Sequence, residues 1–186
     1  MKYAVFALMI TVAGPVVGQS THGHPVDSNG MPMHDMTNMP GLQGTNAQPH
    51  ESAELAVMFN NFSTLSRRVE NLPNGIRSVT TSSDPAVMDA LVSHVVGMIG
   101  RVEAKDSPDI FIQSPTLDIF FERGDQIETT IDVTDEGIVV VQTSDDPELV
   151  EAMHVHAAEV SAMAERGMMA VHEMMMQQHH SSEMKI

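Results

Sequence analysis

The sequence predicts an α+β domain in which an antiparallel sheet of about four strands is covered by helices. Three observations lead to this expectation. A strand-turn-helix unit is repeated, short β-branched segments are separated by hairpin-turn residues, and two longer segments carry apolar residues at spacings of three and four. Strands joined by tight turns and flanked by helices are typical of α+β proteins. The expected order is a β-α-β-β-β-α core preceded by one helix.

The repeated unit is marked by a short polar turn. Residues 81–85 read Thr-Ser-Ser-Asp-Pro, and residues 143–147, 62 positions later, read Thr-Ser-Asp-Asp-Pro. Asp84 and Asp146 suit the N-cap position, because a carboxylate accepts a free backbone N–H there, and proline is favoured at the first helical position. We therefore expect a strand to end and a helix to begin at each copy.

Each copy continues into an amphipathic helix. The first is expected from Pro85 to about Glu103, and the second begins at Pro147 and continues past Gly167. The two apolar stripes are Val87, Leu91, Val95, Met98 and Val102, and Leu149, Met153, Ala157, Val160 and Ala164. A histidine stands nine residues after each proline, at His94 and His156. If the two helices lie side by side on one sheet, the repeat brings these imidazoles near each other.

Four segments have the composition of strands. They are residues 76–81, 117–122, 127–133 and 138–143. The breaks at 123–125 and 134–137 contain Gly and Asp and read as hairpin turns. The continuous apolar run at the start of the last segment suits a central strand.

An amphipathic helix is expected before the first strand, over residues 51–70, where apolar residues such as Leu55 and Phe59 share one face. The sequence Leu-Pro-Asn-Gly at 72–75 ends it. The resulting core domain, residues 51–166, is loosely similar to ferredoxin-like folds and is long enough to bury a core of its own.

The two chain ends differ from this core. A basic start, an apolar run and a small residue at Gly18 predict a signal peptide over residues 1–18. Residues 19–50 are rich in Gly, Pro, Asn, Met and His without periodicity, which predicts a disordered arm. Residues 167–186 are expected to form a Met- and His-rich helix extension and tail. We therefore expect an exported protein, periplasmic or secreted, without stable membrane insertion.

The composition narrows the range of partners. The chain has 25 Asp and Glu against 9 Lys and Arg, which disfavours nucleic acid. It has no cysteine, so disulfides, thiolate metal sites and covalently attached haem are excluded. It has 17 Met and 10 His, however, and thioether and imidazole are ligands of soft to borderline metals. The composition therefore favours Cu(I) or Ag(I) among metal ions.

The two repeated helices offer the best ordered metal site. Its candidate ligands are His94, Met98, His156 and Met163. Met98 is one helical turn from His94, whereas Met163 is seven residues from His156. A metal-bound imidazole needs an acceptor at its other ring nitrogen, and Glu159 or the Ser93 hydroxyl is available. The competing interpretation is that both histidines are hydrogen-bonded structural residues.

Three functions fit these features. The first is an exported copper-binding protein for Cu(I) or Ag(I) sequestration, tolerance or delivery, with metal ions and a copper-transport protein or cuproprotein as partners. The second is a redox enzyme with a copper or non-covalent haem centre at the paired histidines, although a haem pocket usually needs more aromatic residues. The third is an interaction domain with Met-rich docking ends and no metal. A homodimer is also left open.

The sequence contains no motif of a common enzyme class. It has no Gly-rich phosphate loop, no Gly-x-Ser-x-Gly, no His-Glu-x-x-His and no cysteine nucleophile. In composition and expected export it resembles periplasmic copper-handling proteins that use Met and His clusters. That resemblance covers the arm and the tail and assigns no functional residue. We therefore expect a binding protein rather than an enzyme.

Overall fold

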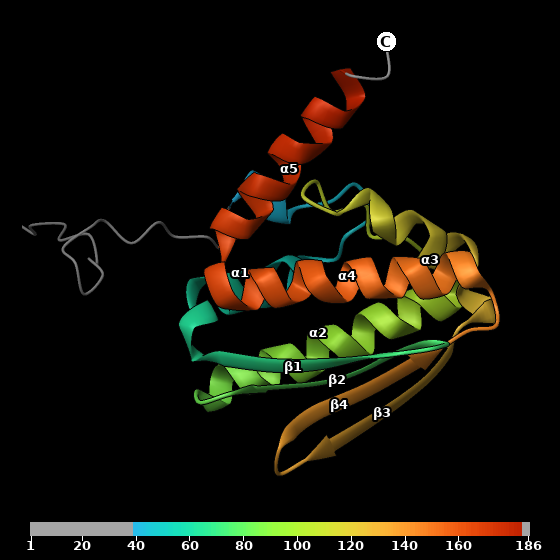
Figure 1. Cartoon of the computed structure of the whole chain (residues 1–186). Helices are drawn as coiled ribbons and strands as arrows, with labels where there is room; N and C mark the ends of the chain where they lie inside the picture. The colour runs from blue at the N-terminus through green and yellow to red at the C-terminus, as the bar shows by residue number, and fades with distance from the viewer. Residues whose placement is uncertain (1–38, 184–186) are drawn as a thin grey trace, which may run out of the picture. The chain divides into compact units, whose positions relative to one another are not determined.

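The computed structural model describes residues 39–183, with side chains described up to residue 177 (Figure 1). The expected signal peptide and most of the expected arm lie outside the described residues. Within them the protein has a four-stranded antiparallel sheet and five α-helices. The α+β class, an antiparallel sheet of four strands and a helix before it are confirmed.

The core consists of two copies of a β-β-α unit. The first copy comprises β1 (Leu65–Leu72), β2 (Gly75–Ser82) and α2 (Pro85–Ala104), and the second comprises β3 (Glu128–Thr134), β4 (Gly137–Thr143) and α4 (Pro147–Arg166). The starts of β2 and β4, and those of α2 and α4, are separated by the same 62 residues. The strand order is β1-β2-β4-β3, with every pair antiparallel. The sequence repeat therefore extends to a hairpin and a helix.

The expected caps begin both repeat helices. The Asp84 side chain accepts the backbone N–H groups of Ala86 and Val87, and the Asp146 side chain accepts that of Glu148. A proline follows each cap at the first helical position. The two aspartates are thus accounted for as helix caps.

The helix expected over residues 51–70 is shorter than predicted. It is α1 (Pro49–Asn60), and after one 3₁₀ turn at Phe62–Thr64 the chain enters β1. Leu65 and Val69 are four residues apart, which fits one face of a helix but also one face of a strand. Half-buried and exposed residues alternate from Leu65 to Glu70 and identify the strand.

The strand expected over residues 117–122 is wrong. A 3₁₀ turn at Pro115–Leu117 leads into α3 (Asp118–Glu122), and a further 3₁₀ turn spans Gly124–Gln126. Phe120 and Phe121 are adjacent in sequence and both buried, which a half-exposed strand cannot provide. The observed order is therefore β-β-α-α-β-β-α rather than β-α-β-β-β-α. The number of strands is unchanged because β1 replaces the segment lost here.

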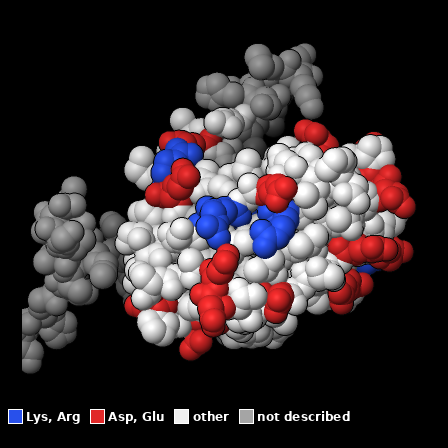
Figure 2. All heavy atoms as spheres, turned by 60° about the horizontal axis from the view of Figure 1, so that its bottom comes forward, with Lys and Arg blue, Asp and Glu red and all other residues white. Residues whose placement is uncertain are grey.

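Both repeat helices cover the same face of the sheet. Ile76 pairs with Gln142 and Thr80 with Ile138, so Ile76, Ile138 and Val140 point to one side. Ile76 belongs to the same buried cluster as residues of α4, and Ile138 and Val140 to the same cluster as residues of α2. Figure 2 shows a different face, on which a central group of basic side chains is surrounded by more numerous acidic ones.

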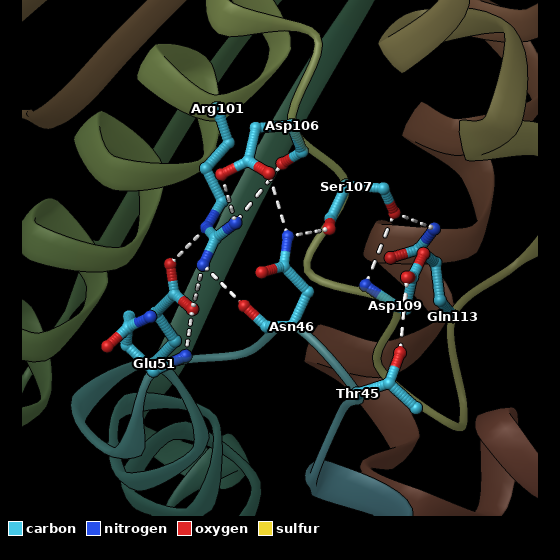
Figure 3. A network of polar contacts seen from close by, with 9 residues as sticks. Thr45, Asn46, Glu51, Arg101, Asp106, Ser107, Asp109 and Gln113 are labelled. Atoms are coloured by element: carbon cyan, nitrogen blue, oxygen red, sulfur yellow. Dashed lines mark hydrogen bonds and ion pairs between the residues drawn. The ribbon is translucent and has the colours of Figure 1, made fainter.

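The end of the expected arm is part of the fold. Leu42, in a 3₁₀ turn at Pro40–Leu42, is fully buried, and Gly44 forms a β-bridge with Ile110. Figure 3 shows the polar network that holds this segment on the loop after α2. At its centre, Arg101 donates to both carboxylate oxygens of Glu51, at 2.5 and 2.9 Å, and to Asp106 at 2.8 Å.

The second repeat helix ends at Arg166 instead of continuing. Gly167 has a φ of +57° and lies against the ring of Phe62, and α5 (Met168–Glu183) follows as a separate helix. Ala170 and Val171 are buried on α5. Three of its methionines are exposed: Met169, Met175 and Met176. Among the described helices, only α2 is long and apolar enough to cross a membrane by length and composition, and 17% of that segment is buried.

Candidate metal centre

His94 lies on α2 beside a carboxylate of α1. Its Nδ1 atom is 3.7 Å from Glu54 Oε2, which is close enough for an ion pair when the imidazole is protonated but too long for a hydrogen bond. Nδ1 is buried and has no hydrogen-bond partner. The other oxygen of Glu54 accepts the hydroxyl of Ser93 at 2.5 Å. The carboxylate is thereby held beside the ring.

His156 has a corresponding arrangement on α4. Its Nδ1 atom is 3.7 Å from Glu159 Oε2 and is likewise buried without a hydrogen-bond partner. The other oxygen of Glu159 accepts the hydroxyl of Ser114 at 2.8 Å. The ring of Phe120 meets the imidazole edge-on, with 5.6 Å between the ring centres. Both repeat histidines therefore face a glutamate that is fixed by a serine.

The pKa values of the two carboxyl groups reflect these partners. The pKa of Glu54 is lowered chiefly by His94, with burial opposing the shift and Ser93 adding to it. Burial has the largest effect on the pKa of Glu159 and acts to raise it, but His156 and Ser114 together outweigh burial and leave the pKa lowered. Both glutamates are therefore ionised acceptors at neutral pH, as a carboxylate that orients a metal-bound imidazole must be.

The two histidine-glutamate pairs do not merge into one cluster. Among the side chains of residues 39–177, no three His, Asp or Glu groups lie together so that they could hold one metal ion. Glu54, the partner of His94, lies on α1, whereas Glu159, the partner of His156, lies on α4 itself and is held by Ser114 in the segment before α3. A metal at either histidine would thus have to complete its ligand set with thioethers or with groups beyond the described residues.

The two candidate methionines share a helix with their histidines and are both half-buried. Met98 follows His94 by four residues, which corresponds to a rise of about 6 Å along α2. Met163 follows His156 by seven residues, a rise of about 10.5 Å along α4. Met98 therefore lies about one helical turn from His94, whereas Met163 lies about two turns from His156.

His154, two residues before His156, has a structural role. Its Nε2 atom lies 3.1 Å from the carbonyl oxygen of Leu72 and 2.9 Å from that of Gly75. These two carbonyls flank the turn of the β1-β2 hairpin, so His154 ties α4 to that turn. This histidine is not available as a metal ligand through Nε2.

Sequence reasoning found one of the two carboxylates. Glu159 lies one helical turn from His156, so its position follows from spacing alone. Ser93 was the other expected acceptor, but its hydroxyl donates to Glu54 instead. Glu54 was missed because it lies on a different helix, and only the packing of α1 on α2 brings it to His94.

Comparisons with protein-family models, with curated proteins and with solved structures find no match for this chain. The assignment of function therefore depends on the site itself.

Proposed function

We propose that this is an exported protein that binds Cu(I) or Ag(I) through histidine and methionine ligands, for sequestration, tolerance or delivery. One observation carries the proposal. Each of two histidines at equivalent repeat positions has a buried Nδ1 next to an ionised glutamate, and that glutamate is fixed by a serine hydroxyl. Such a carboxylate orients an imidazole and makes its other nitrogen a better metal ligand.

The absence of a three-residue His, Asp or Glu group among the side chains of residues 39–177 argues for a soft metal. Zinc and harder cations are usually held by such groups, or by thiolates, which this chain lacks. Methionine thioethers suit Cu(I) and need no deprotonation. We propose two ligand pairs, His94 with Met98 and His156 with Met163. The exposed methionines of α5 supply further donors.

A Cu(I) competition titration of the full exported chain against a chromophoric chelator tests this function. We expect His94→Ala and His156→Ala each to weaken binding at its own site by at least about tenfold, because loss of an outer-shell partner alone typically costs 10–100-fold. His172→Ala is the matched control, since His172 is exposed on α5. Tight binding that is unchanged in both of the first two variants would rule out the proposal.

A redox centre at the same histidines is the second candidate. The edge-on contact of Phe120 with His156 favours it, because it supplies one aromatic wall next to a potential axial ligand. Optical and electron-spin-resonance spectra of the metal-loaded protein separate the two functions. A signal that changes when a small oxidant or reductant is added would favour the redox centre over storage or delivery.

A further inference from the structure

Arg67 occupies an unusual position on the helix-covered side of β1. It pairs in register with Thr80, on the face to which Ile138 points, and α4 packs across this strand. Its Nη1 donates to the Thr80 hydroxyl at 2.6 Å, and its Nε is buried without a partner. Within the described part of the chain, Arg67 has no ion pair with any carboxylate. This differs from Arg68 on the opposite face, which pairs with Glu136 at 3.1 Å.

A half-buried guanidinium without a counter-charge is costly. A guanidinium has five N–H donors, and removing its charge from water is unfavourable unless an anion or several acceptors replace the water. Burial accordingly lowers the pKa of Arg67 to about 10. The chain nevertheless keeps arginine at a position where an apolar residue would pack without this cost.

The repeat shows that the fold does not require this arginine. The second copy places Thr129 where the first places Arg67, and Gln142 where the first places Thr80. That neutral pair lies in the same register, with Gln142 Nε2 3.5 Å from the Thr129 hydroxyl. The β-β-α unit is therefore built with an uncharged pair in one copy and with an unpaired cation in the other.

Arg67 also lines a pocket of about 310 Å³ between the start of β1 and the last turns of α4. The other lining residues are Phe62, Ser63, Leu65, Ser66, Ser161, Ala164 and Glu165. Phe62 and Leu65 provide an apolar wall. The polar surface comes from Arg67, Glu165 and the serine hydroxyls. The pocket therefore combines a cation that has no counter-charge among the described residues with room for a small molecule.

We propose that this pocket binds a small anion, a carboxylate or a phosphate, through the guanidinium of Arg67. The planar fork of N–H groups matches two oxygens of either ligand, and the bound anion would supply the missing counter-charge. Glu165 lines the same pocket, and none of the described ion pairs joins it to Arg67. Its negative charge opposes a bound anion. The lining of this pocket shares no residue with the proposed metal ligands.

Calorimetric titration of the full chain at constant ionic strength tests the site, with acetate and inorganic phosphate as separate probes. We expect saturable binding of one probe at millimolar concentration, and the probe that binds identifies the ligand class. Arg67→Gln should abolish binding. Arg67→Lys should weaken it about tenfold, because an ammonium lacks the fork. Glu165→Gln should strengthen it. Arg68→Gln, the matched control on the other face of β1, should leave it unchanged.

Two results would overturn the proposal. One is the absence of saturation with both probes up to about 50 mM, which is well above a millimolar dissociation constant. The other is equal binding by the wild type and Arg67→Lys together with no effect of Glu165→Gln. These measurements decide the question even if circular dichroism shows that Arg67→Gln does not fold.

Discussion

At the scale of single residues, the ion pair between Glu51 and Arg101 is the contact on which the N-terminal segment most depends. Glu51 is 4% exposed, and Arg101 meets both of its oxygens while also donating to the backbone carbonyl of Asn46 at 2.9 Å. The pKa of Glu51 is lowered although burial, the largest influence, acts to raise it. The carboxylate is therefore buried in its charged form and depends on its partner.

Replacing Arg101 by methionine should lower the free energy of unfolding by about 3–5 kcal/mol, because it leaves a buried charge without compensation. Urea unfolding measured by circular dichroism checks this. Arg68→Met is the control, since Arg68 and Glu136 form an exposed pair whose loss should cost less than about 1 kcal/mol. If both substitutions lowered the free energy of unfolding equally, burial of the Glu51–Arg101 pair would not explain its contribution to stability. Adding Glu51→Gln to Arg101→Met should recover part of the loss.

At the scale of elements, the junction between α4 and α5 depends on Gly167. Its φ of +57° is a backbone conformation that side chains rarely adopt, and a Cβ atom there would lie 2.7 Å from the ring of Phe62. Gly167→Ala should therefore destabilise the protein by roughly 1–3 kcal/mol. The thermal unfolding midpoint should fall accordingly.

Gly97 is the matched control for this substitution. It lies inside α2, and an added Cβ would meet no atom within 4 Å. Gly97→Ala should raise stability by about 0.5–1 kcal/mol, because alanine is the better helix former. If both substitutions shifted the unfolding midpoint in the same direction, the explanation given for Gly167 would be wrong.

The elements that could be predicted from the sequence are those in which several local signals agree. Both repeat helices have a capping aspartate, a following proline and an apolar stripe, and both begin at the predicted proline, although the second ends at Arg166 instead of continuing. The segments around Leu65 and Phe120 carry only one signal each, and that signal fits a helix as well as a strand. Their assignment depends on which neighbour each segment packs against, and this is not encoded locally.

At the scale of the whole molecule, the duplication is what made the fold predictable. A constant offset between two copies implies equivalent positions on one sheet, and it correctly placed His94 and His156 on two helices that cover the same face. It could not indicate the residues that contact these histidines, because the segments packed on the two helices are not repeated. These segments are α1 on α2, and α3 with its preceding turn on α4. The metal ligands therefore stay a proposal while the scaffold is confirmed.

The free edge of the sheet leads to the last prediction. Six of the seven residues of β3 are exposed, including Ile131 and Val133 on the helix-covered side. Next to this edge, Leu91 of α2 packs on β4 and Val92 lies against the same cluster, while Val96, one turn beyond Val92, is 49% exposed. An apolar edge strand beside an apolar helix face favours pairing with another strand. A second copy of this chain supplies the same edge and the same helix.

Charge and spacing select one way of pairing. If β3 pairs antiparallel with its copy around Ile131, Asp132 lies opposite Thr130 and Glu128 opposite Thr134. A shift by two residues in either direction places Asp132 opposite a carboxylate of the second copy, which is either Asp132 or Glu128. Like charges directly opposite each other destabilise a strand pair. Strands are about 4.8 Å apart, so the two β4 strands would lie about 14 Å apart, and Ile131 and Val133 of both copies would line the covered side of the joined sheet between the two α2 helices.

We therefore expect the protein to form a homodimer through β3, which equilibrium sedimentation of the full chain measures directly. Ile131→Lys should shift it to a monomer, because a charge on the covered side of the strand cannot be buried between the two α2 helices. Thr130→Lys is the matched control, since the neighbouring residue points to the open face and would lie opposite Asp132 of the copy. A wild-type protein that stays monomeric at high micromolar concentration would refute the prediction. A dimer that survives Ile131→Lys would show that the contact lies elsewhere.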